Sequence, residues 1–165
     1  MDGIKKMSEQ IAEEYDEELQ RWVTFKLDNE VYGVSVSEVR EVLRYSNIAP
    51  VPGAPSFVVG IINLRGNVVT VIDTRNRFGL PSAEVSDESR IIIVDMADQE
   101  VGVLVDSVAE VVDIDANTIE AAPNVGNEDT SRYINGVTSL EGNLLILVDV
   151  KKLLTDDELA DLSGF

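Results

Sequence analysis

Apolar and polar positions alternate along much of the chain, as is typical of β-strands with one buried and one exposed face. The alternation is clear over Val23–Leu27 and again over Val31–Val36. The polar residues Asp28–Glu30 separate these two runs, so we expect a β-hairpin. The segment Ser37–Leu43 fits a short helical turn and a strand equally well.

A longer hairpin is predicted for Gly60–Asp73, where two apolar runs flank a tight turn that contains Gly66. Glycine adopts positive φ at no steric cost, which such turns require. The same pattern returns in Gly136–Asp149, 76 positions further along (136 − 60), with Gly142 in place of Gly66.

A second block repeats in the same order. Tyr32–Val42 overlays Val101–Val111 at a shift of 69 positions (101 − 32). Two blocks in register favour an internal repeat over a chance likeness between two hairpins. Four glycines at matching places are expected to serve structural turns or close backbone approaches: Gly33, Gly66, Gly102 and Gly142.

The repeat predicts how the chain is organised. We expect an acidic helix or tail over residues 1–21, a first β-barrel lobe over 22–85, a second lobe over 86–154, and a helix over 155–165 that packs on the body. Each lobe holds four or five short strands, the size of a small closed barrel. Lobes this small bury little surface alone, so the two are expected to pack together.

Both ends of the chain are predicted to be helical. An apolar stripe with helical spacing marks the N-terminal segment: Ile11, Tyr15, Leu19 and Trp22. This helix would either pack Trp22 onto the body or bind a partner. Near the C-terminus, Thr155 and Glu158 have the spacing of a capping box, and Leu159 and Leu162 would dock the helix.

Composition narrows the function classes. The 165 residues contain neither cysteine nor histidine, which excludes thiol chemistry and removes the commonest general base and metal ligand. A net charge of −18 disfavours nucleic acid and anionic membranes as partners, and no apolar run approaches the length of a membrane span. We expect a cytoplasmic protein with no cofactor, no metal and no membrane insertion.

Positive charge is concentrated in one part of the chain. Residues 40–90 contain six arginines, no lysine and five acids, so this part carries +1 while the rest carries −19. Arginine is enriched in protein interfaces. Solvated surface arginines are the alternative interpretation.

The sequence contains no complete motif for catalysis or for metal binding. Asp113–Asn117 resembles the start of a calcium loop, but Thr118 and Asn124 occupy the positions that require Gly and Glu. No phosphate-binding loop or nucleophile elbow occurs, so we expect no catalytic residues and no enzyme. Arg65 and Glu41 stand out instead, because neither turn geometry nor packing asks for a charge there. Each is an interface residue or a solvated one.

Five motifs carry a family resemblance. In chain order they are V-R-E-V-L at Val39–Leu43, A-P-V-P-G-A-P-S-F-V-V-G-I-I at Ala49–Ile62, N-L-R-G at Asn63–Gly66, V-V-T-V-I-D at Val68–Asp73 and L-I-L-V-D at Leu145–Asp149. Through them, the chain from Val23 to Leu154 resembles the CheW family of bacterial chemotaxis coupling proteins. The resemblance implies an all-β fold of two intertwined, SH3-like five-stranded β-barrels, to which the sequence adds short N- and C-terminal helices.

The resemblance also implies a role as an adaptor. Such a protein links the cytoplasmic tips of chemoreceptors, the methyl-accepting chemotaxis proteins, to the regulatory domain of the histidine kinase CheA, within membrane-associated receptor arrays. It couples receptor state to kinase activity. The resemblance places partner binding at Arg65, Glu41, Val36, Val39 and Ile62. A self-assembling structural barrel protein and a carboxylate- or metal-dependent enzyme are the alternatives.

Overall fold

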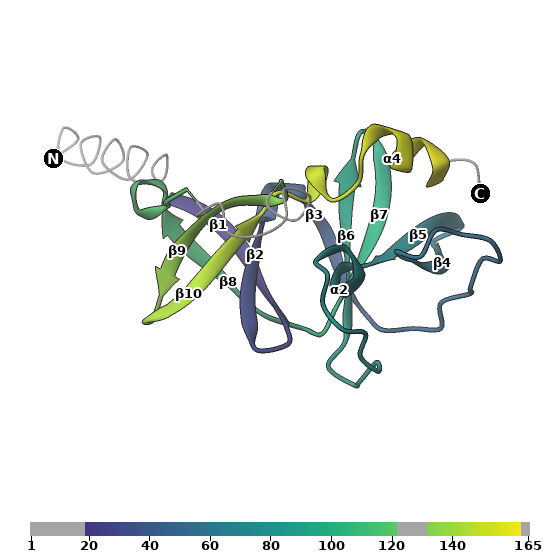
Figure 1. The fold of residues 1–165 in the computed structure, drawn as a ribbon, viewed down its shortest axis with the longest axis horizontal. Coiled ribbons are helices and arrows are strands. Elements are labelled where there is room, and N and C mark those ends of the chain that lie inside the picture. The colour runs from purple at the N-terminus through teal and green to yellow at the C-terminus, as the bar shows by residue number, and fades with distance from the viewer. Residues whose placement is uncertain (1–18, 122–131, 163–165) are drawn as a thin grey trace, which may run out of the picture.

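The computed structural model describes residues 19–121 and 132–162, which form two five-stranded β-sheets (Figure 1). The prediction of an all-β fold with two five-stranded units is confirmed. The sheets lie next to each other along the long axis of the molecule. Among the described residues, no helix combines the length and apolar character needed to cross a membrane.

The β1 sheet has the strand order β8-β1-β2-β10-β9. Its strands are β1 (Leu19–Leu27), β2 (Glu30–Ser35), β8 (Ser107–Asp115), β9 (Ile134–Leu140) and β10 (Asn143–Val148). The β3 sheet has the order β3-β6-β7-β5-β4. Its strands are β3 (Val39–Arg44), β4 (Val58–Leu64), β5 (Asn67–Asp73), β6 (Arg90–Met96) and β7 (Gln99–Val105).

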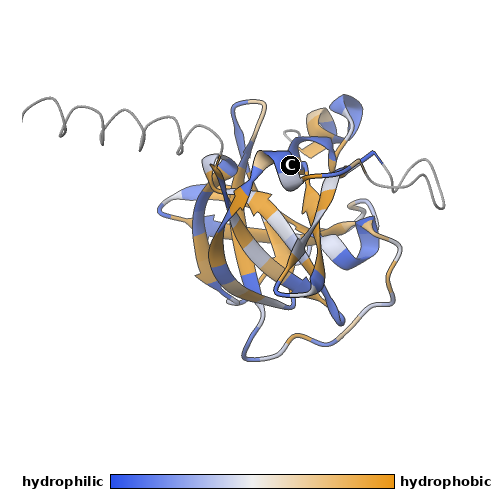
Figure 2. Cartoon of the chain, turned by 90° about the vertical axis from the view of Figure 1, so that its left-hand side faces the viewer, coloured by the Kyte–Doolittle hydropathy of each residue, from blue (hydrophilic) through white to orange (hydrophobic). Residues whose placement is uncertain are grey.

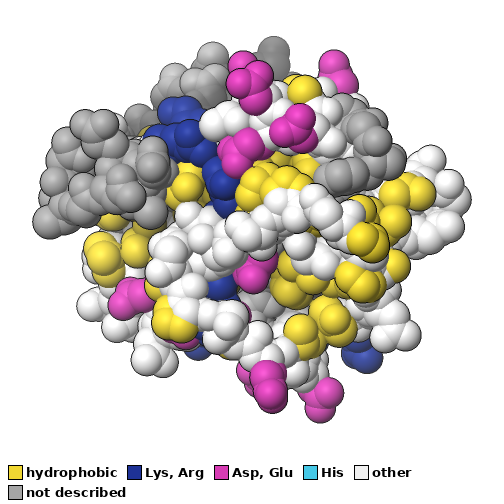
Figure 3. Space-filling model, turned by 45° about the vertical axis from the view of Figure 1, so that its right-hand side comes forward, with side chains coloured by type: hydrophobic (Ala, Val, Ile, Leu, Met, Phe, Trp, Pro, Cys, Tyr) yellow, Lys and Arg dark blue, Asp and Glu magenta, His cyan; other side chains and the backbone are white. Residues whose placement is uncertain are grey.

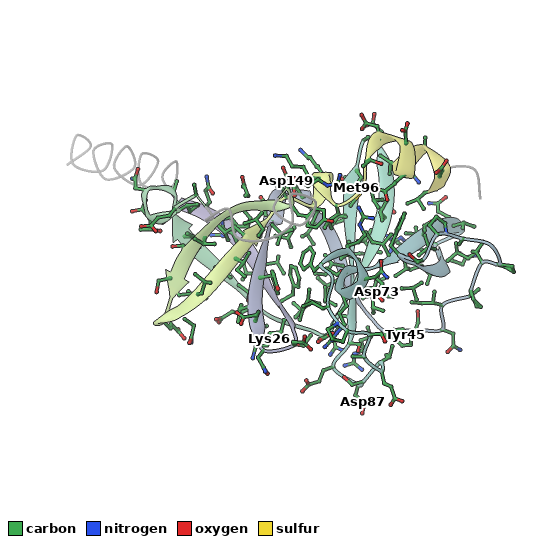
Figure 4. All side chains as sticks on the ribbon, viewed as in Figure 1. Lys26, Tyr45, Asp73, Asp87, Met96 and Asp149 are labelled. Atoms are coloured by element: carbon green, nitrogen blue, oxygen red, sulfur yellow. The ribbon has the colours of Figure 1, made fainter. Side chains whose placement is uncertain are left out.

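Short helical segments connect the strands. They are η1 (Val36–Glu38), α2 (Thr74–Arg77), η2 (Ala116–Thr118), η3 (Val150–Lys152) and α4 (Asp156–Leu162). The ambiguous segment that precedes Arg44 therefore contains both predicted forms, a 3-10 turn followed by a strand. Asp73 and Asp149, labelled in Figure 4, accept backbone hydrogen bonds at the starts of α2 and η3 and so cap these elements at repeat-equivalent positions.

Each sheet takes strands from both halves of the chain. The β1 sheet joins β1 and β2 to β8, β9 and β10, through a parallel pairing of β2 with β10. The β3 sheet contains the strands from β3 to β7, and within it β5 pairs in parallel with β7. The expected boundary between residues 22–85 and 86–154 therefore does not divide the sheets. This is a correction to the predicted lobes, and it explains why the two units are intertwined.

Two glycines make the exchanged pairings possible. Gly33 lies opposite Leu147, and a Cβ on Gly33 would come within 3.1 Å of the Leu147 side chain. At the equivalent place in the other sheet, Gly102 lies opposite Val71, where a Cβ would come within 3.1 Å. Both glycines lie inside strands, so of the two predicted roles the turn is wrong for them and the close approach is confirmed: they allow close packing across the sheet.

A shared core holds the sheets together. Phe25 and Tyr32 of the β1 sheet belong to the same buried cluster as Ile72, Ile92 and Val103 of the β3 sheet. Figure 2 shows the hydrophobic colouring concentrated in the strands and the hydrophilic colouring in the turns. A row of aromatic rings runs through this core, with neighbouring centroids 5.2–5.6 Å apart: Phe25, Tyr32, Phe78 and Tyr133.

The two predicted helices have different outcomes. Leu19 and Trp22 lie in strand β1, so the predicted N-terminal helix does not include them; the rest of its stripe lies outside the described residues. Trp22 is only 3% exposed and packs in the β1 sheet. At the other end, the amide N of Thr155 donates to Glu158 Oε1 at 2.9 Å, and the amide N of Glu158 donates to Thr155 Oγ1 at 3.1 Å. The capping box is therefore present.

Candidate functional site

The turn between β4 and β5 presents Arg65 at its tip. Arg65 and Gly66 form a two-residue loop with φ values of +51° and +89°. Positive φ at both positions is the geometry of a type I′ hairpin turn. The side chain of Asn63 stabilises it, since its Oδ1 accepts a hydrogen bond of 2.9 Å from the Gly66 amide. The turn therefore directs Arg65 outward, and its side chain is 68% exposed.

Arg65 forms a two-point ion pair with Glu41 of strand β3. Arg65 Nη1 donates to Glu41 Oε2 at 3.3 Å, and Nη2 donates to Oε1. The hydrogen bonds from Arg65 hold the pKa of Glu41 below its ordinary value, and Glu41 in turn raises the pKa of Arg65. Strands β3 and β4 are the two edges of the β3 sheet, so this pair joins one edge to the other and closes the sheet toward a barrel.

The other predicted partner-binding residues lie in different surroundings. Val36 and Val39 are half-buried where the chain crosses between the sheets, and both pack against the shared core. Ile62 is 7% exposed and belongs to a separate core cluster of the β3 sheet. The structure thus brings Arg65 and Glu41 together, while Ile62 has almost no surface to offer a partner.

Two exposed apolar side chains were not predicted as part of this surface. Val42, next to Glu41 in β3, is 40% exposed, and Val68, directly after the turn, is 64% exposed. No alternation along β5 could have indicated this, because the strand is buried at every position from Val69 to Ile72 and only its first two residues, next to the turn, are exposed. Both valines lie within three residues of the ion pair along the chain, and exposed apolar side chains together with arginine are common in protein interfaces.

The acidic side chains of the described residues can be checked for a metal site. Among residues 19–121 and 132–162, no group of three acidic side chains is placed to hold a metal ion. Asp115, from the rejected calcium-loop sequence, instead caps η2 by accepting a 2.9 Å hydrogen bond from the Asn117 amide. The face shown in Figure 3 carries only small groups of Lys and Arg side chains among apolar and acidic ones.

Comparison with known proteins decides the family. Residues 21–158 match the family model described as the CheW-like domain. The chain belongs to this family. It is 36% identical over 135 residues to the chemotaxis protein CheW of Bacillus subtilis, covering 82% of this chain and 86% of that protein. It is 33% identical over 141 residues to the chemotaxis protein CheW of Klebsiella aerogenes, covering 86% and 85%.

A solved structure agrees with these relatives. The scaffolding protein TtCheW from Thermoanaerobacter tengcongensis superimposes with a TM-score of 0.77 at 36% identity, over 84% of this chain and 90% of that one. The CheW resemblance predicted from the motifs is therefore confirmed, together with the chemotaxis adaptor function that it implies. The family is one of scaffold and adaptor proteins.

Within this CheW-like chain, two of the six clustered arginines are structural. Arg75 and Arg77 have side chains only 12% exposed. Arg75 bonds to Asp106, and Arg77 donates to both carboxylate oxygens of Glu158 at 2.9 and 3.1 Å. These pairs fix elements to one another and offer little surface. The Arg65 side chain, in contrast, is 68% exposed although it is paired with Glu41.

Proposed function

We propose that this CheW-like chain is a cytoplasmic adaptor that joins chemoreceptor tips to the regulatory domain of the histidine kinase CheA within membrane-associated arrays. The observation that carries the proposal is the Arg65–Glu41 pair, in which the Arg65 side chain is 68% exposed at the tip of the β4–β5 turn. Arginine beside apolar contact area is common where binding energy is concentrated. In this proposal Arg65 and Glu41 lie in the partner-binding surface.

The partner-binding surface is proposed to include Val36 and Val39 as well, at the place where the chain crosses between the sheets. Both are half-buried and rest on the shared core, so their exposed parts are held in fixed positions. A receptor tip is a helical hairpin, and one apolar face of a helix can pack on such side chains. Ile62, which is buried in the separate core cluster of the β3 sheet, is proposed to act only by fixing the β4–β5 hairpin that carries Arg65.

Coupling then follows from differential contact and needs no reaction centre. A ligand signal changes the conformation of the receptor tip. Kinase activity changes only to the extent that the adaptor binds the two receptor conformations, or the two kinase states, with different free energies. The net charge of −18 keeps copies of the chain apart in the absence of partners.

A reconstitution tests the proposal. The full chain is mixed with a receptor cytoplasmic fragment and with the kinase regulatory domain, separately and together, and complexes are measured by sedimentation. We expect binding to each partner, a ternary complex, and receptor-dependent autophosphorylation when the whole kinase is used. Failure to bind either partner would overturn the proposal. Polymerisation of the chain alone would favour the self-assembling alternative.

A further inference from the structure

A cavity of about 180 Å³ lies in the β1 sheet, beside the turn between β9 and β10. Its apolar walls include Val31, Leu140 and Leu145, and its charged residues are Lys26, Glu110 and Glu141. Lys26 is labelled in Figure 4. The cavity shares none of these residues with the Arg65–Glu41 site.

The internal repeat shows what occupies the same place in the other sheet. Glu110 is equivalent to Glu41 (110 − 41 = 69), and Glu141 is equivalent to Arg65 (141 − 65 = 76). Glu141 also has the same turn geometry, with φ of +52° against +51° for Arg65. The β3 sheet therefore has an arginine bound to its glutamate at this place, whereas the β1 sheet has a second glutamate.

A second ion pair of the β3 sheet also has no counterpart at the equivalent positions of the β1 sheet. Arg40 Nε donates to Asp95 Oδ2 at 2.6 Å in the β3 sheet, next to the Arg65–Glu41 pair. The equivalent residues in the β1 sheet are Ala109 and Lys26 (109 − 40 and 95 − 26, each 69). Alanine leaves vacant the space that an arginine side chain would take, and both replacements line the cavity.

The residues around the cavity are complementary to a cation with an apolar neighbour. Within the described residues, Glu110 and Glu141 form no ion pair, and both are exposed. Lys26 is the opposing cation, so the three groups sum to −1. Leu144, which also lines the cavity, has a side chain that is 53% exposed although it is large and apolar.

We propose that this cavity binds an arginine side chain of a partner protein. This arginine pairs with Glu110 and Glu141 of the β1 sheet, in the way that Arg65 of the same chain pairs with Glu41 in the β3 sheet. A guanidinium can bond to two carboxylates at once, which a lysine ammonium does with less geometric specificity. An apolar residue next to that arginine covers Leu144. The partner is a different protein, because two copies of a chain with a charge of −18 repel each other. The proposal does not depend on the chemotaxis role.

The test uses a dipeptide probe, acetyl-leucyl-arginine amide, titrated into the ¹⁵N-labelled full chain and followed by NMR. We expect saturable shifts of the amides of Glu110, Glu141 and Leu144. The isosteric citrulline dipeptide lacks the charge, and we expect it to bind about tenfold more weakly, since a charged hydrogen-bonding group is worth about that factor. Equal binding of the two dipeptides, or no binding by the arginine dipeptide, would overturn the proposal.

Variants locate the site. Glu110→Gln and Glu141→Gln should each weaken the probe about fivefold, and Glu141→Arg should abolish its binding by supplying the arginine internally. Glu88→Gln, an exposed acid in the linker of the other sheet, is the matched control and should have no effect. Probe binding that survives Glu141→Arg contradicts the assignment. Self-association of the wild type that Glu141→Arg removes would assign the arginine to a second copy and contradict the choice of partner.

Discussion

The guanidinium of Arg75 forms a two-point ion pair with the carboxylate of Asp106, in which Nε donates to Oδ1 at 2.8 Å and Nη2 donates to Oδ2. Arg75 lies in α2, directly after strand β5 of the β3 sheet, and Asp106 lies where the chain crosses from β7 to β8 of the β1 sheet. Nη2 also lies 2.7 Å from Asp28 Oδ1 in the β1–β2 turn. One largely buried cation therefore fixes two carboxylates at the junction of the sheets.

Asp106→Asn should destabilise the fold by about 2 kcal/mol at neutral pH, because it leaves a buried guanidinium with a weaker partner. The hydrogen bonds from Arg75 lower the pKa of Asp106 despite its partial burial. Stabilisation from a lowered pKa is fully present above the unfolded-state value of about 4 and is lost as pH falls through the folded-state value. Urea unfolding at pH 7, 5, 4 and 3 should show the difference between wild type and variant shrinking below pH 4.

Arg40→Ala is the matched control for this pair. Arg40 bonds to Asp95 at 2.6 Å, but the two side chains are 60% and 39% exposed. Exposed pairs contribute little to stability because solvent screens them, so we expect a small effect. A loss at Arg40 as large as that at Asp106, or a difference for Asp106→Asn that does not depend on pH, would show that burial does not set the strength of these pairs.

Local features of the fold could be predicted from the sequence, but the strand exchange could not. Alternation and the glycine turn indicate the β4–β5 hairpin because both signals lie within a few residues. The pairing of β2 with β10 joins Gly33 to Leu147, far apart in the sequence. Since β5 and β10 are repeat equivalents with similar apolar patterns, pairing within a repeat and pairing between repeats satisfy the same pattern. Only the three-dimensional packing distinguishes them.

The candidate site was predictable in part for a related reason. Arg65 and Glu41 could be singled out because a charge at those places has no role in turn or core, yet nothing local showed that they bond to each other. Ile62 lies two residues before Leu64 and therefore on the same face of β4, so the strand pattern already predicted that both side chains are buried in the core. The family resemblance alone put it at the surface. Val42 is exposed on the wetter face of β3, although an apolar residue there gives no sign of exposure in the sequence.

Gly66→Val should lower the melting temperature because a β-branched residue is strained at φ of +89°. A Cβ on Gly66 would meet nothing within 4 Å, so the cost comes from the backbone alone and is about 1–2 kcal/mol. Thermal unfolding followed by circular dichroism measures it, with a shift of roughly 2–4 °C for each kcal/mol. Gly66→Asn should retain most of the stability, since asparagine tolerates positive φ. An unchanged melting temperature for the valine variant would contradict the turn geometry.

Glu158→Ala should loosen α4 from the body. The Glu158 carboxylate accepts hydrogen bonds from the Thr155 amide and from Arg77, whose guanidinium lies 4.8 Å from the Phe57 ring centroid. Removing the Glu158 carboxylate costs about 2 kcal/mol of stability, because the buried guanidinium of Arg77 loses its partner. Hydrogen exchange of the α4 amides should become faster. Asp157→Ala, in the same helical turn but exposed, should cost only about 0.3–1 kcal/mol. Unaltered protection of α4 in the Glu158 variant would mean that apolar contacts alone dock the helix.

Arg65→Glu should weaken binding to a receptor cytoplasmic fragment about tenfold, within the range found for central interface charges, and should leave the fold intact. The fold is expected to survive because Glu141 already occupies the equivalent turn position with φ of +52°. The variant replaces the ion pair with two repelling carboxylates, so both the contact and its geometry change. A titration monitored by calorimetry measures the affinity, and circular dichroism checks the fold.

The charge-reversed double variant, Arg65→Glu with Glu41→Arg, separates these two effects. It restores an ion pair between the edges of the β3 sheet but inverts its direction. If receptor binding uses the Arg65 guanidinium directly, the double variant stays weak. If the pair acts only by closing the barrel, binding returns to the wild-type value. Asp113→Arg disrupts an exposed pair with Arg21 in the β1 sheet and serves as the control that should not change affinity. Wild-type affinity in the Arg65→Glu single variant would remove Arg65 from the receptor-binding surface.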